Sequence, residues 1–177
     1  MAKMIETNDW HGRPSPYRPR VEIRLGETEL VFAFAAEKAP HCDNSLAEGE
    51  FKEGLWEKDV AEFFVSAGGR SYQEINISPT GAYWSALFSD YRVREKELHL
   101  NPTIEANIGP DSWSVVFKVE CEKLVPWLDV PREKWRFTPT AILHDPHPAF
   151  FCWAEPQSME PDFHAEHLRR PLSDFLD

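Results

Sequence analysis

Two glutamates and a tryptophan occur close together in a stretch of the chain where their types and spacing could support chemistry. Glu62 follows Trp56 by six residues, and Glu74 comes after the Gly68-Gly69 pair. Two carboxyl groups can work as an acid and a base, or they can accept hydrogen bonds from a ligand. An indole ring beside them offers a flat apolar surface. Which of these uses applies depends on the elements that position the three side chains.

Those elements are predicted to be two β-strands joined by a glycine turn. Residues 59–65 are rich in Phe and Val, and residues 72–78 alternate apolar with polar side chains, as the strands of a hairpin do. We expect a register that places Glu62 opposite Glu74. One face of the hairpin then holds core residues, namely Ala61, Phe63, Ile75 and Ile77. The other face then lines a cavity, with Glu62, Glu74, Asn76, Phe64 and Tyr72.

The predicted cavity face combines carboxylates with aromatic rings. A charged residue within a strand is often simply solvated, but two like charges opposite each other are unfavourable unless a cationic or hydroxyl-rich group satisfies them. The C–H face of a sugar ring packs on an indole, and its hydroxyl groups donate to a carboxylate. The pattern therefore favours a sugar site in which Trp56 stacks on the ligand and Glu62, Glu74, Asn76 and Tyr72 share its polar side.

The same residues carry a resemblance to a known family. The sequence LWEKDVAEFFV followed by YQEINISPTGAYW resembles the family 9 carbohydrate-binding modules and their DOMON-like relatives. The later segment FFCWAEPQSMEPDFH is similar to the closing strand and tail of standalone bacterial members, so the resemblance covers residues 55–164. It implies an antiparallel β-sandwich that binds a sugar between two tryptophans and lacks hydrolytic activity. It also implies Trp56 as one wall, Glu62 as the carboxylate and Trp153 as the second wall.

The rest of the chain reads as further short strands bounded by Gly and Pro turns. They are predicted at residues 21–25, 29–36, 82–88, 103–108, 113–120, 136–143 and 149–154. We predict an all-β fold, a two-layer antiparallel β-sandwich of the jelly-roll or DOMON-like type with little helix. Trp84 is read as a core residue, with a place in the cavity as the alternative. Residues 1–177 are expected to form one domain, with 1–20 as an extended arm and 155–177 as a tail packed on the body.

The composition restricts the partners. The 177 residues carry a net charge of −11, with 30 acidic and 19 basic residues, so neither nucleic acid nor an anionic membrane is an expected partner. No apolar stretch is long enough to span a membrane, and no apolar signal core follows the start. We therefore expect a cytoplasmic rather than a secreted protein. The charge and the lack of an apolar heptad pattern favour a monomer or a weak dimer.

Metal ligands and cofactors receive little support from the sequence. Three cysteines with no paired spacing argue against disulfides and zinc clusters. The segments 41–44 (His-Cys-Asp-Asn) and 144–148 (His-Asp-Pro-His-Pro) hold competent metal ligands. Consecutive ligands rarely converge, so we read the first segment as a polar loop. The prolines on either side of His147 indicate that the second segment is mainly a rigid turn. No cofactor is predicted with certainty. Structural calcium stays open, because related sugar modules carry it and the loops hold carboxylates: Glu48, Glu50, Asp90 and Asp111.

Two other functions compete with sugar binding. Cross-strand neighbours Glu62 and Glu74 could approach the roughly 5 Å separation of a retaining glycoside hydrolase. Neighbours on one hairpin face form a floor, however, and do not flank a bond from opposite sides. A haem-binding DOMON-like domain would need axial ligands such as Met159 and His164. We prefer non-catalytic binding to either alternative.

Overall fold

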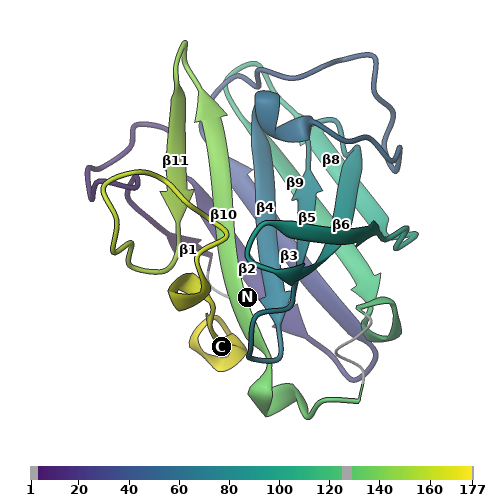
Figure 1. The fold of residues 1–177 in the computed structure, drawn as a ribbon. Coiled ribbons are helices and arrows are strands. Elements are labelled where there is room, and N and C mark those ends of the chain that lie inside the picture. Colours follow the sequence, from purple (N-terminus) through teal and green to yellow (C-terminus); the bar gives the residue numbers. More distant parts are fainter. Residues whose placement is uncertain (1–3, 125–128, 177) are drawn as a thin grey trace.

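Two antiparallel β-sheets face each other in the computed structural model, which describes residues 4–124 and 129–176 (Figure 1). The first sheet has, in order, β1 (Ile5–Glu6), β2 (Arg20–Leu25), β3 (Glu29–Ala36), β9 (Trp113–Glu120) and β8 (Thr103–Ile108). The second has β11 (Pro148–Cys152), β10 (Arg136–His144), β4 (Val60–Ser66), β5 (Tyr72–Ile77), β6 (Tyr83–Asp90) and β7 (Val93–Glu97), and β12 (Arg170–Pro171) pairs with the start of β10. The predicted all-β sandwich is confirmed.

Helical structure in the described residues is confined to short 3-10 turns. They are η1 (Leu55–Glu57), η2 (Cys121–Lys123), η3 (Arg132–Lys134), η4 (Glu166–Leu168) and η5 (Leu172–Asp174). Within this part of the chain, no helix has the length and apolar character that crossing a membrane requires.

The core between the sheets follows from alternation along the strands. In β3, Phe32 and Phe34 point inward and are fully buried, because every second side chain of a strand faces the same way. Phe63 of β4 contacts Phe32 from the other sheet, with the two rings 4.9 Å apart, and it is stacked 5.0 Å from the ring of Phe137. Aromatic packing of this kind holds the two layers at a fixed separation.

The predicted hairpin exists as β4 and β5, but its register differs from the expected one. Glu62 lies opposite Asn76, and Glu74 lies opposite Phe64. The expected pairing of the two glutamates is therefore wrong, because the turn that contains Gly68 and Gly69 is two residues longer than that pairing allows. A shift of two residues leaves every side chain on its predicted face. It also removes the direct juxtaposition of two like charges.

The outer face of the second sheet is also covered. Trp10 of the N-terminal arm and Phe163 and Leu168 of the C-terminal segment pack against it, and the Thr138 hydroxyl donates to the Leu168 carbonyl. Figure 1 shows this C-terminal segment (yellow) lying over the sheet beside β10 and β11. All seven residues of β4 are consequently buried. The polar side chains on its outer face therefore lie in an enclosed environment.

Candidate ligand-binding site

A cavity of about 420 Å³ opens on the outer face of the second sheet. We call it the binding cavity; its lining residues are Glu53, Trp56, Glu62, Phe64, Glu74, Trp84, Phe88, Arg92, Arg94, Ile142, Phe150, Pro161, Phe163 and His164. Strands β4, β5, β6 and β10 supply its floor, while η1, the β6–β7 hairpin and the C-terminal segment supply its sides. Mostly apolar walls with a few converging polar groups are typical of small-ligand sites.

Two buried carboxyl groups form the polar floor. Glu62 is 2% exposed and accepts a hydrogen bond from the Thr140 hydroxyl at 3.1 Å. Burial, together with repulsion by the neighbouring Glu74, raises the pKa of Glu62 well above its ordinary value. Burial likewise raises the pKa of Glu74 to about 7, although the Asn76 amide donates to this carboxyl at 3.0 Å. The floor can therefore offer protonated carboxyl groups as well as carboxylates near neutral pH.

His164 lies beside this floor, and a hydrogen bond with the Tyr72 side chain fixes its ring. The Tyr72 hydroxyl is 2.6 Å from His164 Nδ1 and also accepts the backbone N–H of Arg92. We assign the phenol as the donor to Nδ1, which leaves the ring proton on Nε2, 3.8 Å from a carboxyl oxygen of Glu74. Burial, reinforced by the positive charge of Arg92, lowers the pKa of His164 to about 4. The imidazole is thus neutral at pH 7.

Two tryptophans form the aromatic side. Trp56 stands on η1, which Gly54 introduces with a positive φ of 87°, and its side chain is 36% exposed. Its ring meets that of Trp84 edge to face, with centroids 5.4 Å apart. Trp84 is 2% exposed and donates from Nε1 to Glu97 at 3.0 Å. Trp84 thus belongs to the buried cluster and also lines the cavity, so the two readings of the sequence both apply.

The structure places Trp153 away from the binding cavity. Its indole donates to the carbonyl of Ile5 and packs edge to face against Phe34, on the side of the inter-sheet core. The alternation of β11 explains this position, because Phe150 faces the cavity and Phe151 faces the core. The place beside Trp56 that the resemblance implied for Trp153 is occupied by Trp84.

Three charged side chains of the cavity, Glu53, Arg92 and Arg94, were not identified from the sequence. Arg92 adopts a positive φ of 55° in the β6–β7 turn and pairs with Asp162 at 2.9 Å. Arg94 lies over the Trp84 ring, 5.8 Å from its centre, and pairs with Glu53. The sequence around these arginines is charged and is typical of a loop followed by an edge strand, so it gave no signal that they line a cavity.

His164 belongs to the predicted C-terminal tail, and the structure places it in the cavity. Its side chain lines the cavity beside Phe163. Met159, its proposed partner in a haem site, is 80% exposed and is not part of the cavity lining. Nothing in this arrangement favours porphyrin.

The loop carboxylates considered for calcium make contacts within the protein. Glu48 accepts the backbone N–H of Ala106, and Glu50 accepts that of Ala47. Asp90 pairs with Arg70. A calcium site on these loops stays a prediction.

Comparisons with known proteins place the fold. No protein-family model and no curated protein matches the sequence. A proposed carbohydrate-binding protein from Bacteroides uniformis has a TM-score of 0.74 at 14% identity, over 96% of this chain and 84% of that one. A family 9 carbohydrate-binding module from Caldicellulosiruptor kristjanssonii, solved with glucose, has a TM-score of 0.54 at 9% identity, over 78% of this chain and 67% of its own.

The structure of a family 9 module from the same organism with cellotriose gives a TM-score of 0.56 at 9% identity, over 85% of this chain and 72% of that one. Identities this low report on architecture and not on ligand contacts. The chain therefore has the β-sandwich fold that carbohydrate-binding modules of family 9 also have.

Proposed function

We propose that this protein binds a sugar or the end of an oligosaccharide in the binding cavity and does not cleave it. The observation that carries the proposal is the meeting of two buried carboxyl groups with a partly exposed indole in one cavity of about 420 Å³. A cavity that pairs an apolar ring with hydrogen-bonding oxygens suits a ligand with an apolar C–H face and a hydroxyl edge.

Each part of the cavity has a role in this proposal. The exposed part of the Trp56 ring offers the stacking surface, while Trp84 holds that ring from the side. Glu62 and Glu74 bind hydroxyl groups from the floor, and Arg94 donates from the rim. Because the pKa values of both glutamates are raised, their carboxyl groups can donate as well as accept. The two family 9 modules solved with glucose and cellotriose support these sugars as the first ligands to test.

The geometry of the carboxyl groups favours binding over hydrolysis. Glu62 and Glu74 project from one face of adjacent strands and are offset diagonally by two positions. A glycoside hydrolase places its two carboxyl groups on opposite sides of the bond that breaks. Side-by-side groups on a floor contact one edge of a ligand instead. The cavity is accordingly proposed as a recognition site.

Calorimetric titration of a panel of mono- and oligosaccharides against wild type and Trp56→Ala tests the proposal. We expect micromolar to millimolar affinity in the wild type, because stacking and hydrogen bonding compete with water. Loss of the stacking ring should cost about 1 to 2 kcal/mol, which weakens binding roughly 5- to 30-fold. The fold should persist, because the indole stands at the mouth of the cavity.

Trp153→Ala is the matched control, since it removes the same side chain from the opposite face of the sheet. It should lower the melting temperature and leave sugar affinity unchanged. The proposal fails if no sugar in the panel binds the wild type. It also fails if Trp56→Ala binds as tightly as the wild type.

A further inference from the structure

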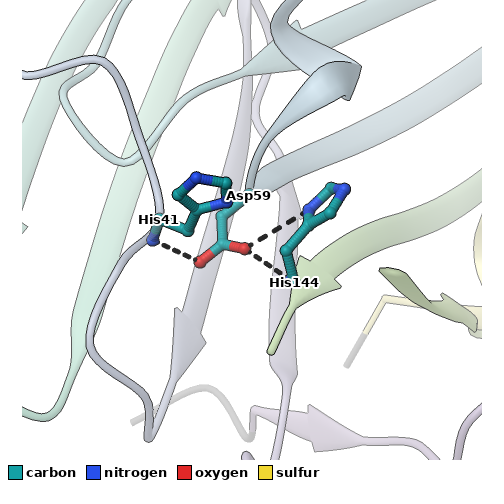
Figure 2. Close-up of side chains that lie close together, drawn as sticks. All are labelled: His41, Asp59 and His144. Atoms are coloured by element: carbon teal, nitrogen blue, oxygen red, sulfur yellow. Dashed lines mark hydrogen bonds and ion pairs between the residues drawn. The ribbon is translucent and has the colours of Figure 1, made fainter. Parts of the chain in front are cut away.

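Two histidines from separate parts of the chain meet one buried aspartate at an end of the sandwich, outside the binding cavity. His41 belongs to the loop after β3, Asp59 immediately precedes β4, and His144 is the last residue of β10. Strands β4 and β10 are antiparallel neighbours that pair Val60 with Ile142, so the start of one strand lies beside the end of the other. Figure 2 shows the aspartate carboxylate between the two imidazole rings.

The aspartate is fixed in place and keeps one binding position open. Asp59 is fully buried. Its Oδ2 accepts hydrogen bonds from Lys38 Nζ at 2.8 Å and from the His41 backbone N–H at 2.9 Å. Among the residues that the structure describes, its Oδ1 accepts a hydrogen bond only from the His144 backbone N–H, at 2.7 Å. A carboxylate has about four lone-pair sites, so one site on Oδ1 remains for a further partner.

The imidazole of His144 faces that remaining site without bonding to it. His144 Nδ1 is buried and lies 3.6 Å from Asp59 Oδ1, and it has no hydrogen-bond partner within residues 4–124 and 129–176. This separation is too long for a hydrogen bond. Two ligand atoms that each lie about 2.1 Å from a tetrahedral metal ion are about 3.4 Å apart. The gap between the two atoms is thus close to the gap that a shared ion requires.

His41 completes a third ligand position. Its ring centre is 5.7 Å from that of His144, and one ligand atom from each of the three residues lies within 4.8 Å of the others. The backbone holds His41 on both sides, since its N–H donates to Asp59 and its carbonyl accepts the Asp59 N–H at 2.9 Å. His41 is exposed, which gives an ion a path from solvent.

We propose that His41, Asp59 and His144 form a binding site for a divalent transition-metal ion of the zinc class. Two imidazoles and one carboxylate suit such ions, whereas calcium and magnesium prefer oxygen ligands alone. The Lys38 ammonium contacts the other carboxylate oxygen, where it orients the ligand as outer partners do in metal sites. The remaining coordination position would be taken by water. An ion here ties the loop that leads to η1 onto the sheet.

The segments 41–44 and 144–148 were judged from the sequence as a polar loop and a rigid turn and not as metal sites, because neither segment can converge on an ion by itself. The structure changes that interpretation: each segment contributes one histidine, and Asp59 supplies the ligand that neither segment holds. The proposed site does not depend on sugar binding in the cavity, so the two proposals can fail separately.

Titration of the full chain with Zn²⁺, after treatment with a chelator, tests the site. We expect one ion per chain in the wild type, and an affinity at least about tenfold weaker in His41→Ala and in His144→Ala. Zn²⁺ should also raise the melting temperature of the wild type and not that of His144→Ala. The matched control is His147→Ala, which removes an exposed imidazole from the same turn and should bind Zn²⁺ as the wild type does.

Circular dichroism establishes that each variant is folded before titration. Cys42→Ser tests whether the neighbouring thiol is needed, and we expect unchanged binding. The proposal is overturned if the wild type shows no stoichiometric binding, or if both ligand variants bind Zn²⁺ as well as the wild type. Equal losses in His147→Ala would also overturn it, because they would indicate unspecific surface binding.

Discussion

Replacing Glu74 by Gln should make the protein more stable at mildly alkaline pH. The pKa of this carboxyl is about 7 in the folded chain because of burial, against an ordinary value of 4.5. The folded state therefore holds a proton between these values, where the unfolded state has released it. The stability contributed by this proton is fully present below pH 4.5 and is lost as the pH rises through 7.

The structure sets the size of the effect. The difference between 4.5 and about 7 corresponds to about 3 kcal/mol of unfolding free energy. Glutamine cannot ionise, yet its carbonyl oxygen can still accept the hydrogen bond from Asn76 that the glutamate accepts now. We expect Glu74→Gln to match the wild type near pH 4.5 and to exceed its unfolding free energy by as much as about 3 kcal/mol near pH 8.

The titration of His164 changes the stability with pH in the opposite direction, and its contribution must be separated from that of Glu74. Its pKa is about 4 in the folded chain against 6.5 ordinarily, so its contribution is present above pH 6.5 and is lost as the pH falls toward 4. In the wild type the two trends oppose each other between pH 4.5 and 6.5. The comparison is therefore made between variant and wild type at each pH, where the His164 contribution is common to both.

Urea unfolding followed by tryptophan fluorescence, at a series of pH values from about 4.5 to about 8, measures this difference. Glu57→Gln is the control, because Glu57 is exposed and its replacement should leave the profile unchanged. A Glu74→Gln variant that is less stable than the wild type at pH 8 would refute the reasoning. A stability difference that does not change with pH would refute it equally, since it would show that the folded state does not retain the proton.

Two further changes test the cavity floor and the core. Glu62→Gln should keep the fold and weaken sugar binding about fivefold, as expected for one altered hydrogen bond; calorimetric titration measures it, and unchanged affinity would remove Glu62 from the site. Phe63→Ala should cost about 3 to 5 kcal/mol of unfolding free energy, because its ring packs between those of Phe32 and Phe137. Urea unfolding measures this cost, and a loss below about 1 kcal/mol would contradict the packing described.

Most of the fold could be predicted from local pattern alone. The β4–β5 hairpin was correct in its strands and in both of its faces, although its register was not. The reason is that a strand repeats every two residues, so an error of two positions changes the partner of Glu62 and keeps the side on which it lies. The sheet face on which a side chain lies can thus be predicted more reliably than the residue opposite it on the next strand.

The cavity could be predicted only in part, because some of its residues are brought together by tertiary packing. Trp56 and Glu62 lie six residues apart in one segment, so their proximity follows from a single turn and strand. His164 reaches the cavity from a segment without a repeating pattern, and it is fixed there by a contact with Tyr72 far away in the chain. Trp153 was misplaced because only the exact phase of β11 decides which sheet face its indole joins.

The C-terminal segment that covers the second sheet can change in sequence more freely than the strands beneath it. Pro161, Phe163 and His164 line the cavity from an irregular segment, whereas Glu62 and Glu74 do so from paired strands. Insertions and substitutions in irregular segments disturb few backbone hydrogen bonds. Under the proposed function, ligand preference can therefore change through substitutions in this segment while the sandwich stays the same. A library that varies residues 159–162 and 164 and keeps the buried Phe163 would test this on an unchanged sandwich.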